Sequence, residues 1–502
     1  MIAGRRASSP ERRPVGANVI RIGIALTAAF AVLAAFAGYW QVYRSAPLSE
    51  APDNPLVVAA ARNVVRGKIV DRHGTVLATS KRDANNEPYR TYASPVLAPV
   101  IGYASRQFGT AGLERSFDAE LTGIVRSDPV DELLKKFDTQ RYDPEQLTLS
   151  LSLPLQRAAV AGLADDRGAV VMLDPRTGEV LALASTPVFD ASAVANPDTS
   201  VRAFERLRDD PAQPLLPRAT QGRYVPGSVF KIVTAIAALG SGAITAETTF
   251  PEQPQAEHDG LVVSGFRVRE HPGVPQRSFD LAAATEVSSN IYFALAGLRT
   301  GGMALAEWAG RLGFGAPIPF DLPSAGSQLT NGGGRAGGGF TDDVEIANAA
   351  YGQAETLVTP LQMALVAATV ANRGVLMKPH VVVALDGARS GRREIAPEVW
   401  QSALSGADAA AIRDAMVRAV ESPIGRQFTS GAKVPNVTTA GKSGTAELGG
   451  EGEPNSWFIG FAPAEDPQIA IAVLVEHGGR GGARAAPLAG QLMSAYFGGL
   501  GQ

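Results

Sequence analysis

An uncharged, mostly apolar run of 19 residues near the N-terminus, Ile22 to Trp40, most constrains what this chain can fold into. A helix needs about 20 such residues to span a bilayer. The run follows five arginines, Arg5, Arg6, Arg12, Arg13 and Arg21. By the positive-inside rule, residues 1–21 form a cytoplasmic tail, residues 22–40 a transmembrane anchor, and the bulk of the chain is extracytoplasmic.

A cleaved signal peptide is the alternative reading of this run. Ala35-Phe36-Ala37 has the small-x-small form that a signal peptidase accepts. The length of the run, and Tyr39 and Trp40 at its far end, favour an uncleaved anchor, because aromatic residues gather at membrane interfaces.

Composition excludes several classes of function. The net charge of −3 argues against a general nucleic-acid binder, which usually carries a basic excess. Cysteine is absent, so disulfides, thiolate metal sites and a cysteine nucleophile are impossible. The five histidines are scattered and form no His-Glu-x-x-His pair. We therefore expect no metal site.

Residues 41–146 are predicted to form a linker followed by a support domain. Ser45 to Pro55 is rich in Pro, Ala and acidic residues, as in a short linker. Val64 to Leu77 alternates and turns at His73-Gly74, which predicts a strand pair. Leu113 to Leu121 and Pro129 to Phe137 have a helical period. The segment contains no obvious chemistry.

Residues 147–502 are predicted to form a second module of α+β class. Gly168 to Asp174 and Glu179 to Ser185 predict a hairpin, and helical segments dominate from Val229 to about Asn372. The C-terminal part predicts three strands and a helix, in Thr438 to Glu447, Trp457 to Ala462, Gln468 to Glu476 and Pro487 to Phe497. Strands at both ends of the module imply one antiparallel sheet assembled from both.

The glycine-rich segment Asn331 to Gly339 contains a literal Gly-x-Gly-x-x-Gly. A dinucleotide fingerprint needs a buried strand before it, and Asp321-Leu322-Pro323-Ser324 supplies none. We interpret the segment as a loop.

Ser228 and Lys231 form a Ser-x-x-Lys pair at the start of an apolar helix, after Pro226-Gly227. One helical turn separates the two residues, so they share a face. The helix N-terminus also offers N–H groups to an oxyanion. Ser430 and Lys433 repeat the spacing, but Gly431 and Pro435 argue against a rigid helix, so we expect surface residues there.

The simpler interpretation of Ser228 is a helix cap beside a solvated lysine. Only eight of the 46 basic residues are lysines, however, and lysine is the one that can titrate near neutrality. A serine hydroxyl needs such a base to become a nucleophile.

Two further groups suit the same chemistry. Ser288-Ser289-Asn290 precedes a helical run and offers hydroxyls and an amide, although a helix cap has the same residues. Lys442-Ser443-Gly444-Thr445 lies on a predicted strand, where glycine lets a substrate backbone approach. A phosphate loop would require glycine at the position of Asn436. The ordered triple Ser-x-x-Lys, Ser-x-Asn and Lys-Ser-Gly is a strong signal where each member alone is weak.

The chain resembles the class B penicillin-binding proteins. Within that class it is most similar to the small penicillin-binding protein A group of actinobacterial type. The matching runs extend from about Arg66 to Glu476 and are RGKIVDRHG, GTAGLERSFD, GAVVMLDPRTGEVLALAS, RYVPGSVFK, TLVTPLQMALVAATVANRG, TAGKSGTAE and WFIGFAP. Two features depart from the pattern, namely Ser443 in place of the commoner threonine and the glycine-rich segment.

The resemblance implies a serine β-lactamase-like transpeptidase domain with a five-stranded antiparallel sheet, preceded by a dimerisation-like pedestal. It implies a D,D-transpeptidase that cross-links D-Ala-D-Ala stem peptides and is trapped by β-lactams. By carry-over Ser228 is the nucleophile, Lys231 its base, and Ser288 and Asn290 relay the proton. Lys442 supplies positive charge. Ser443, Gly444 and Thr445 bind substrate, and the N–H groups of Ser228 and Thr445 form the oxyanion hole.

The resemblance also implies a partner, a membrane glycan polymerase of the shape, elongation, division and sporulation (SEDS) family. Three rivals share the motifs: a β-lactamase or carboxypeptidase, a β-lactam sensor, and a scaffold that has lost activity. The anchor and pedestal disfavour the first, the short segment before the apolar run disfavours the second, and the intact motifs disfavour the third.

One electrostatic expectation follows for the base. Lys231 must be neutral to accept a proton, whereas an unperturbed lysine has a pKa of about 10.4. We expect burial and the nearby charge of Lys442 to lower the pKa of Lys231.

Overall fold

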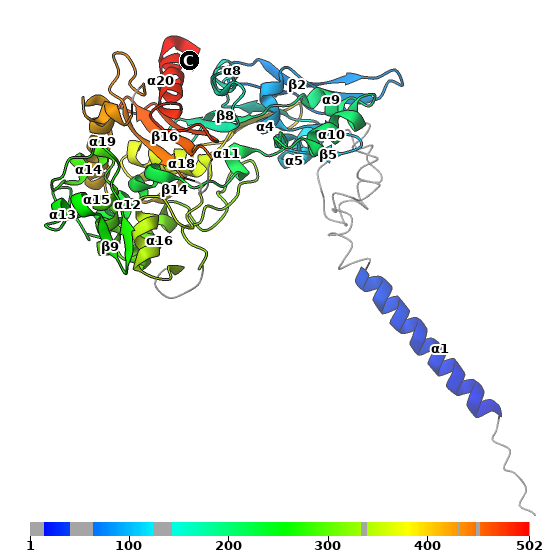
Figure 1. The fold of residues 1–502 in the computed structure, drawn as a ribbon. Coiled ribbons are helices and arrows are strands. Elements are labelled where there is room, and N and C mark those ends of the chain that lie inside the picture. Colours follow the sequence, from blue (N-terminus) through cyan, green and yellow to red (C-terminus); the bar gives the residue numbers. More distant parts are fainter. Residues whose placement is uncertain are drawn as a thin grey trace, which may run out of the picture. The chain divides into compact units, whose positions relative to one another are not determined.

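The computed structural model describes residues 15–40, 64–123, 143–332, 339–429, 431–447 and 452–500. The chain divides into two units (Figure 1). One comprises Met1–Val64 with Ile124–Tyr142, and the other comprises Val65–Gly123 with Asp143–Gln502. The predicted helix in residues 129–137 and most of the glycine-rich segment lie outside the described residues.

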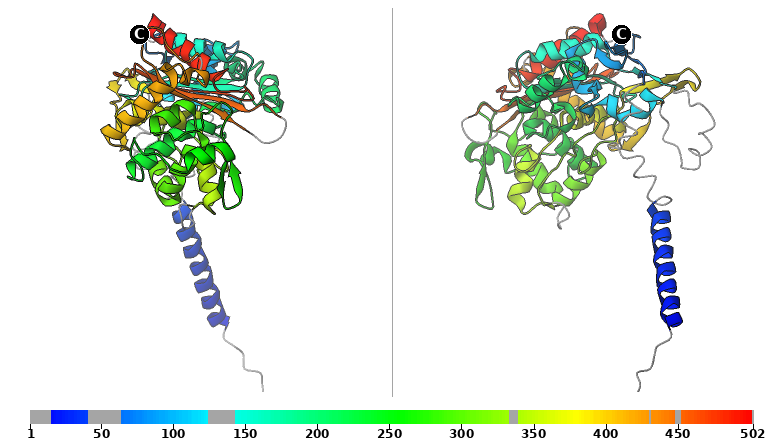
Figure 2. Two further views of the ribbon diagram at one scale, coloured as in Figure 1. Left: turned by 60° about the vertical axis from the view of Figure 1, so that its left-hand side comes forward. Right: turned by 90° about the vertical axis from the view of Figure 1, so that its right-hand side faces the viewer.

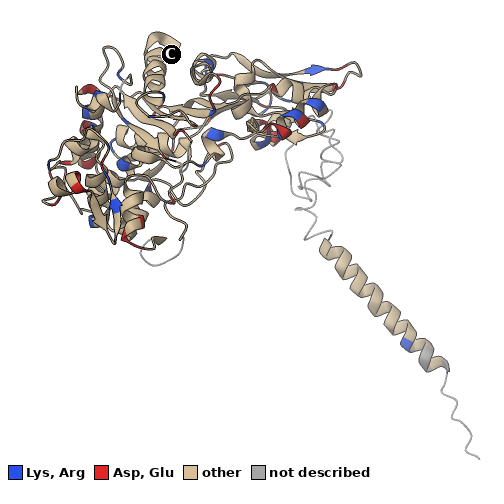
Figure 3. Ribbon diagram, viewed as in Figure 1, with Lys and Arg blue, Asp and Glu red and all other residues tan. Residues whose placement is uncertain are grey.

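The first unit contains helix α1 (Val15–Gly38). Its described side chains are almost all exposed, and Arg21 is its only charged residue, so the ribbon of α1 in Figure 3 is nearly uniform in colour. Residues Val19–Gly38 are long and apolar enough to cross a membrane, by length and composition. Within the part of the chain that the structure describes, this is the one helix long and apolar enough for a single-pass anchor.

A five-stranded antiparallel sheet forms the centre of the second unit, in the order β15-β16-β17-β7-β8. Its strands are β7 (Gly168–Leu173), β8 (Val180–Thr186), β15 (Ala440–Ala446), β16 (Asn455–Ala462) and β17 (Ile469–Val475). The pairing of β17 with β7 places Val473 opposite Val170 and joins the two ends of the module. The predicted α+β fold with one antiparallel sheet is confirmed.

Helices cover both faces of this sheet because both faces are apolar. Helix α18 (Pro360–Ala371) packs on one face, and α8 (Leu153–Leu163) with α20 (Ala485–Ala495) on the other (Figure 1). Adjacent residues of β7 alternate between the two cores: Val171 belongs to the core that contains α18, and Val170 to the core with α8 and α20. This is the period of two that a strand imposes.

On the α18 side, further helices form a lobe that carries part of the site (Figure 2). Helix α12 is buried at its centre and contacts α15 and α16. The main helices of the lobe are α12 (Lys231–Gly240), α14 (Leu281–Val287), α15 (Asn290–Thr300), α16 (Gly302–Arg311), α17 (Asp343–Ala350) and α19 (Gly406–Glu421).

A second, six-stranded sheet has the order β13-β12-β6-β1-β2-β3. The predicted strand pair in residues 64–77 is β1 (Ile69–Val70) with β2 (Val76–Arg82), followed by β3 (Pro88–Tyr92). Strand β6 (Gln146–Leu149) lies parallel to β1 and antiparallel to β12 (Val382–Gly387), which pairs with β13 (Gly391–Glu394). Strands distant in sequence therefore share one sheet, and β6 spans the predicted domain boundary.

The remaining elements are short. They are η2 (Pro95–Leu97), α4 (Ala98–Ile101), β4 (Ala104–Ser105), β5 (Gly109–Thr110), α5 (Leu113–Ser116), α6 (Asp118–Thr122), α9 (Ala191–Ala195), α10 (Ser200–Asp209), α11 (Arg218–Gln221), η3 (Gly227–Phe230), α13 (Gln253–Asp259), β9 (Leu261–Val263), β10 (Phe266–Val268), β11 (Val375–Met377), β14 (Val399–Ser402), η5 (Gly425–Gln427) and η6 (Tyr496–Leu500).

Candidate active site

Ser228 lies in a tight turn that leads directly into α12. The turn η3 follows Pro226, and the helix then begins at Lys231. The sequence predicted a regular α-helix from Val229, whereas the structure has a 3-10 turn up to Phe230 before the α-helix begins. Such turns are common at the N-termini of α-helices. Lys231 is fully buried and Ser228 is partly exposed.

Two glycines let this turn approach strand β15. Gly227 has a φ of +57°, and a Cβ there would lie 2.5 Å from the carbonyl oxygen of Thr445. On the strand, a Cβ at Gly444 would lie 3.0 Å from the carbonyl oxygen of Pro226. Any larger residue at these positions would push the turn that carries Ser228 away from the strand that carries Lys442 and Thr445.

The Lys231 amine meets the Ser288-Ser289-Asn290 turn. Its Nζ lies 2.6 Å from the backbone oxygen of Ser288, 3.3 Å from Ser288 Oγ and 2.8 Å from Asn290 Oδ1. Burial lowers the pKa of Lys231 to about 7, against the opposing effect of the Glu270 and Glu257 carboxylates. Lys231 is therefore a base that can be neutral near physiological pH.

Ser288 occupies the junction between α14 and α15. Its φ of +58° is in the left-handed region, which is costly for a residue with a Cβ and recurs at functional sites. Its hydroxyl accepts a hydrogen bond from Lys442 Nζ at 2.8 Å and lies 3.3 Å from Lys231 Nζ. One hydroxyl thus connects two buried amines.

Lys442 is fully buried, and its Nζ also donates to the backbone oxygen of Ser443 at 3.0 Å. Burial lowers the pKa of Lys442 well below its usual value, and the charge of Lys231 lowers it further. The expectation that burial lowers the pKa of Lys231 is confirmed. The repulsion between the two amines lowers the pKa of Lys442, and the expected contribution of Lys442 to the lowered pKa of Lys231 stays a prediction.

Ser443 and Thr445 alternate with Lys442 and Gly444 along β15. The Ser443 hydroxyl donates to the backbone oxygen of Phe428 at 2.8 Å. The Thr445 hydroxyl instead accepts from the N–H of Gly481 at 3.2 Å, so its own hydrogen can point into the cleft. Thr445 is therefore better placed than Ser443 to donate to a ligand in this conformation.

A cleft of about 940 Å³ joins these elements. The predicted site residues on its wall are Ser228, Ser288, Asn290, Ser443 and Thr445. The buried amines of Lys231 and Lys442 reach Ser288 from within the protein. Lys231 lies 57 positions from Ser288 in the sequence and Lys442 lies 154 positions from it, yet both amines meet at the Ser288 hydroxyl.

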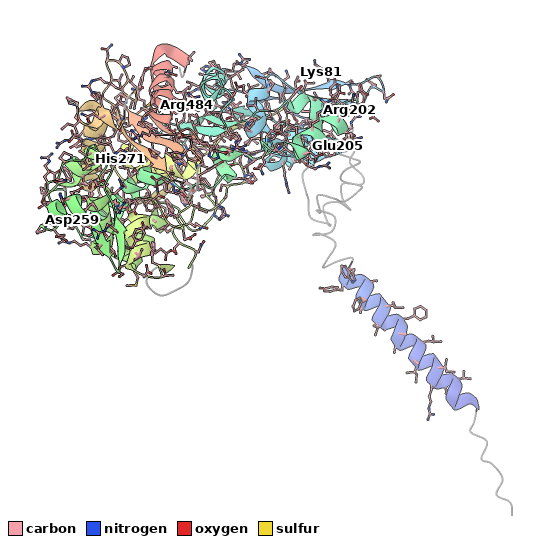
Figure 4. The ribbon with its side chains drawn as sticks, viewed as in Figure 1. Lys81, Arg202, Glu205, Asp259, His271 and Arg484 are labelled. Atoms are coloured by element: carbon pink, nitrogen blue, oxygen red, sulfur yellow. The ribbon has the colours of Figure 1, made fainter. Side chains whose placement is uncertain are left out.

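Sequence reasoning missed one wall of the cleft. The segment after β10 contributes Arg269, Glu270 and His271, and His271 is labelled in Figure 4. A lone glutamate in a polar segment carries no motif, so only its contacts reveal it. Among the described residues there is no group of three or more His, Asp or Glu side chains that could hold a metal ion.

The second Ser-x-x-Lys pair is separate from this site as far as it is described. Lys433 is exposed and pairs with Glu421. This confirms the surface position predicted for Lys433, whereas Ser430 lies outside the described residues.

Comparison with known proteins defines the class. The model of the penicillin binding protein transpeptidase domain matches residues 168–494, and that of the penicillin binding protein A dimerisation domain matches residues 66–143. The peptidoglycan D,D-transpeptidase PbpA of Mycolicibacterium smegmatis is 34% identical over 490 residues, which cover 93% of this chain and 96% of the relative.

Solved structures agree. The penicillin G acyl-enzyme complex of penicillin-binding protein A from M. tuberculosis has a TM-score of 0.75 and 32% identity, and the match covers 86% of this chain and 100% of that one.

A further relative by sequence is the peptidoglycan D,D-transpeptidase MrdA of Acinetobacter baumannii. It is 32% identical over 75% of this chain and 58% of its own length.

The chain therefore belongs to the penicillin-binding protein transpeptidase family. Within that family it is similar to penicillin-binding protein A of mycobacteria. It is a serine-type peptidoglycan D,D-transpeptidase of cell wall synthesis, and β-lactams inhibit it covalently.

Proposed function

We propose that Ser228 is the residue acylated during this reaction and that Lys231 is its general base. The observation that carries the proposal is the position of Ser288 Oγ, 3.3 Å from Lys231 Nζ and 2.8 Å from Lys442 Nζ, on the wall of the cleft that Ser228 also lines. A nucleophile on the cleft wall, a base one helical turn away and a partner that orients the base are the parts that serine acyl transfer needs.

In the first half-reaction, Ser228 Oγ attacks the carbonyl of the penultimate D-alanine while neutral Lys231 takes its proton. The N–H groups of Ser228 and Thr445 stabilise the resulting oxyanion, one from the nucleophile turn and one from β15. Donors of this kind are typically worth about 100- to 1,000-fold in rate. Their proximity follows from the close contact of Gly227 with Thr445.

The leaving D-alanine receives a proton through Ser288, which connects Lys231 to Lys442. Asn290 Oδ1 holds Lys231 Nζ in place at 2.8 Å. In the second half-reaction the amine of an acceptor stem peptide attacks the acyl-enzyme, loses its proton through the same relay, and releases Ser228. The Thr445 hydroxyl binds the donor's terminal carboxylate, with Ser443 and Gly444 shaping that end of the cleft.

Labelling with a fluorescent penicillin tests the nucleophile. Ser228→Ala removes the only hydroxyl that we assign to attack, so covalent labelling should disappear while the melting temperature stays near wild type. Ser430→Ala is the matched control, since it changes the serine of the second Ser-x-x-Lys pair and should label normally. Labelling of Ser228→Ala at the wild-type rate would show that another residue is acylated.

We further propose the domain division 41–146 for linker and pedestal and 147–502 for the transpeptidase domain, with residues 1–21 cytoplasmic. Support comes from the arginines before the apolar helix and from the two family models. On this topology the catalytic domain works outside the cytoplasmic membrane, where stem peptides are cross-linked.

We also propose that a SEDS-family glycan polymerase is the membrane partner. The family resemblance of the pedestal supports it, together with an apolar helix suited to lateral contact in the bilayer. Photo-crosslinking from positions in α1 and in the pedestal should capture this polymerase in intact cells. Efficient crosslinking that never includes it would exclude the proposal.

A further inference from the structure

Glu270 touches the active-site turn from outside the three sequence motifs. It follows β10, and its carboxylate accepts hydrogen bonds from the N–H groups of Asn290 at 2.9 Å and Ile291 at 3.2 Å. It also accepts from the Ser289 hydroxyl at 2.8 Å. A carboxylate at this place satisfies the free N–H groups at the start of α15 and suits the helix dipole.

A second carboxyl group lies behind Ser289. Glu257 on α13 is largely buried, and its Oε1 lies 3.1 Å from Ser289 Oγ and 2.9 Å from Gln253 Nε2. Its Oε2 is buried with no hydrogen-bond partner among the described residues. Burial and the charge of Glu270 raise the pKa of Glu257 to about 8. Near neutral pH Glu257 is therefore mostly protonated, and Glu270 carries the negative charge of the pair.

Three titratable groups lie around the Lys231 amine on three elements: Glu270 after β10, Glu257 on α13 and Lys442 on β15. Arg269 and His271 flank Glu270 on the wall of the cleft, and the backbone oxygen of Arg269 accepts from Asn290 Nδ2 at 3.1 Å. Glu270 differs from the others in that its carboxylate accepts the Asn290 N–H, while Asn290 Oδ1 accepts from Lys231.

We propose that Glu270 is a positioning residue for transpeptidation. Its carboxylate fixes the Ser288-Ser289-Asn290 turn against Lys231 and supplies the negative charge that stabilises the ammonium form of Lys231. Glu257 contacts the same turn through Ser289 as a neutral carboxyl group. The turn that relays the proton is thus set by a carboxylate outside the three sequence motifs.

The rate of acylation by a fluorescent penicillin, measured from pH 5 to 9 on the full-length protein, tests this proposal. Glu270→Gln removes the charge but keeps an oxygen for the N–H groups. The maximal rate should fall roughly tenfold, as for a weakened buried hydrogen-bond set. In the plot of rate against pH, the acidic limb reports the ionisation of Lys231. This limb should also move down by about one pH unit, because loss of the opposite charge of Glu270 favours the neutral amine of Lys231.

Controls separate charge from structure. Asp321→Asn is matched, since its carboxylate likewise accepts two backbone N–H groups, from Val381 and Val382, away from the site. It should leave the pH profile in place. Glu257→Gln imitates the protonated form of Glu257 and should leave the acidic limb in place.

A Glu270→Gln profile with an unmoved acidic limb would overturn the proposal, because a purely structural residue alters the maximal rate alone. If this variant does not fold, Glu270→Asp decides. It keeps the charge but draws it back by one methylene, so the maximal rate should fall while the acidic limb stays. A wild-type maximal rate for Glu270→Asp would contradict a positioning role.

Discussion

At the residue scale, the proposed chemistry depends on two lysines that are buried without a carboxylate bonded directly to either amine among the described residues. Each amine is instead held by neutral oxygens, those of Ser288, Asn290 and Ser443. Burial disfavours the charged form of each amine, which lowers both pKa values. On the proposed mechanism, Lys231 then takes a proton from Ser228 at neutral pH.

Substituting Lys231 with arginine should separate charge from basicity. A guanidinium stays protonated in this range, so penicillin acylation of Lys231→Arg should fall about 100- to 10,000-fold, the usual contribution of a general base. Circular dichroism and the melting temperature should show that the variant folds. Acylation near the wild-type rate would reduce Lys231 to a structural role and move the base function to another group.

In the wild type, the acylation rate should rise as pH increases. The pKa of Lys231 is about 7, so the neutral fraction of its amine grows through that pH and saturates above it. Rapid-mixing measurements from pH 5 to 9 should give half the maximal rate near pH 7. A rate that climbs only toward pH 10 would mean that Lys231 keeps the pKa of a solvated lysine.

At the element scale, the site is a contact between a turn and a strand. Turn η3 and strand β15 approach closely because Gly227 and Gly444 have no side chains. Helix α12 then directs Lys231 inward, and the α14–α15 junction brings Ser288 to it. Each element is ordinary by itself, and the catalytic geometry arises from the way they meet.

Gly227→Ala should therefore impair catalysis more than its local cost suggests. The positive φ alone costs about 1–2 kcal/mol for a residue with a Cβ. The clash with the Thr445 oxygen would also move Ser228 from the strand, so acylation should slow at least about 100-fold, as small misplacements do. Gly242→Ala is the control, since Gly242 has a φ of +72° with open space around it.

The Gly242→Ala variant should lose similar stability from its positive φ but acylate normally. Melting temperatures and penicillin acylation rates of both variants check this. Equal acylation rates would show that the contact between turn and strand is not needed.

At the scale of the whole molecule, strands from both predicted domains share the six-stranded sheet, so the pedestal fold and the transpeptidase fold support one another. A buried ion cluster stabilises the pedestal side. Glu114 accepts from Arg66 at 2.7 Å and from Arg90 at 2.5 Å, and all three side chains are at most 10% exposed.

Removing the acid from this cluster should destabilise the protein strongly. Glu114→Gln leaves the buried Arg90 guanidinium without its anion and Arg66 with Asp118 alone, and breaking a buried pair in this way typically costs about 3–5 kcal/mol. Glu307→Gln, in the exposed pair with Arg311, should cost less than about 0.5 kcal/mol. Thermal unfolding of both variants measures the difference, and equal midpoints would contradict the assigned role of the cluster.

The effect should depend on pH in a definite direction. Burial would raise the pKa of Glu114, but Arg90 and Arg66 together hold it below its usual value. A carboxyl group with a lowered pKa stabilises the fold above its unfolded-state pKa and loses that contribution as the pH falls through the folded-state value. The gap between wild type and Glu114→Gln should therefore be full at pH 7 and shrink in acid.

The absence of cysteine gives a clean test of the proposed orientation. Ala84→Cys, at an exposed turn between β2 and β3, should react with an impermeant maleimide on intact cells. Ser8→Cys, before the apolar helix, should react only after the membrane is opened. The reverse pattern would place the catalytic domain inside.

The features that the sequence predicts are local. The apolar run, the hairpin at Gly168 to Ser185 and the helix after Ser228 depend on neighbours within a few turns, and the structure has them as α1, β7 with β8, and α12. The helix predicted at residues 129–137 stays a prediction. Resemblance to the family identified Ser288, Asn290 and Lys442 as members of one site. It did not include Glu270 or Glu257, because no pattern marks them.

The contacts between groups that are distant in sequence are seen only in the folded chain. Lys442 reaches Ser288 across 154 positions, Glu270 reaches Asn290 across 20, and β12 joins a sheet with β6 from more than 200 residues away. These contacts result from packing two apolar faces of one sheet and from satisfying buried polar groups, which no short window of sequence encodes. The same packing sets the pKa values of both lysines, because burial is a property of the folded chain.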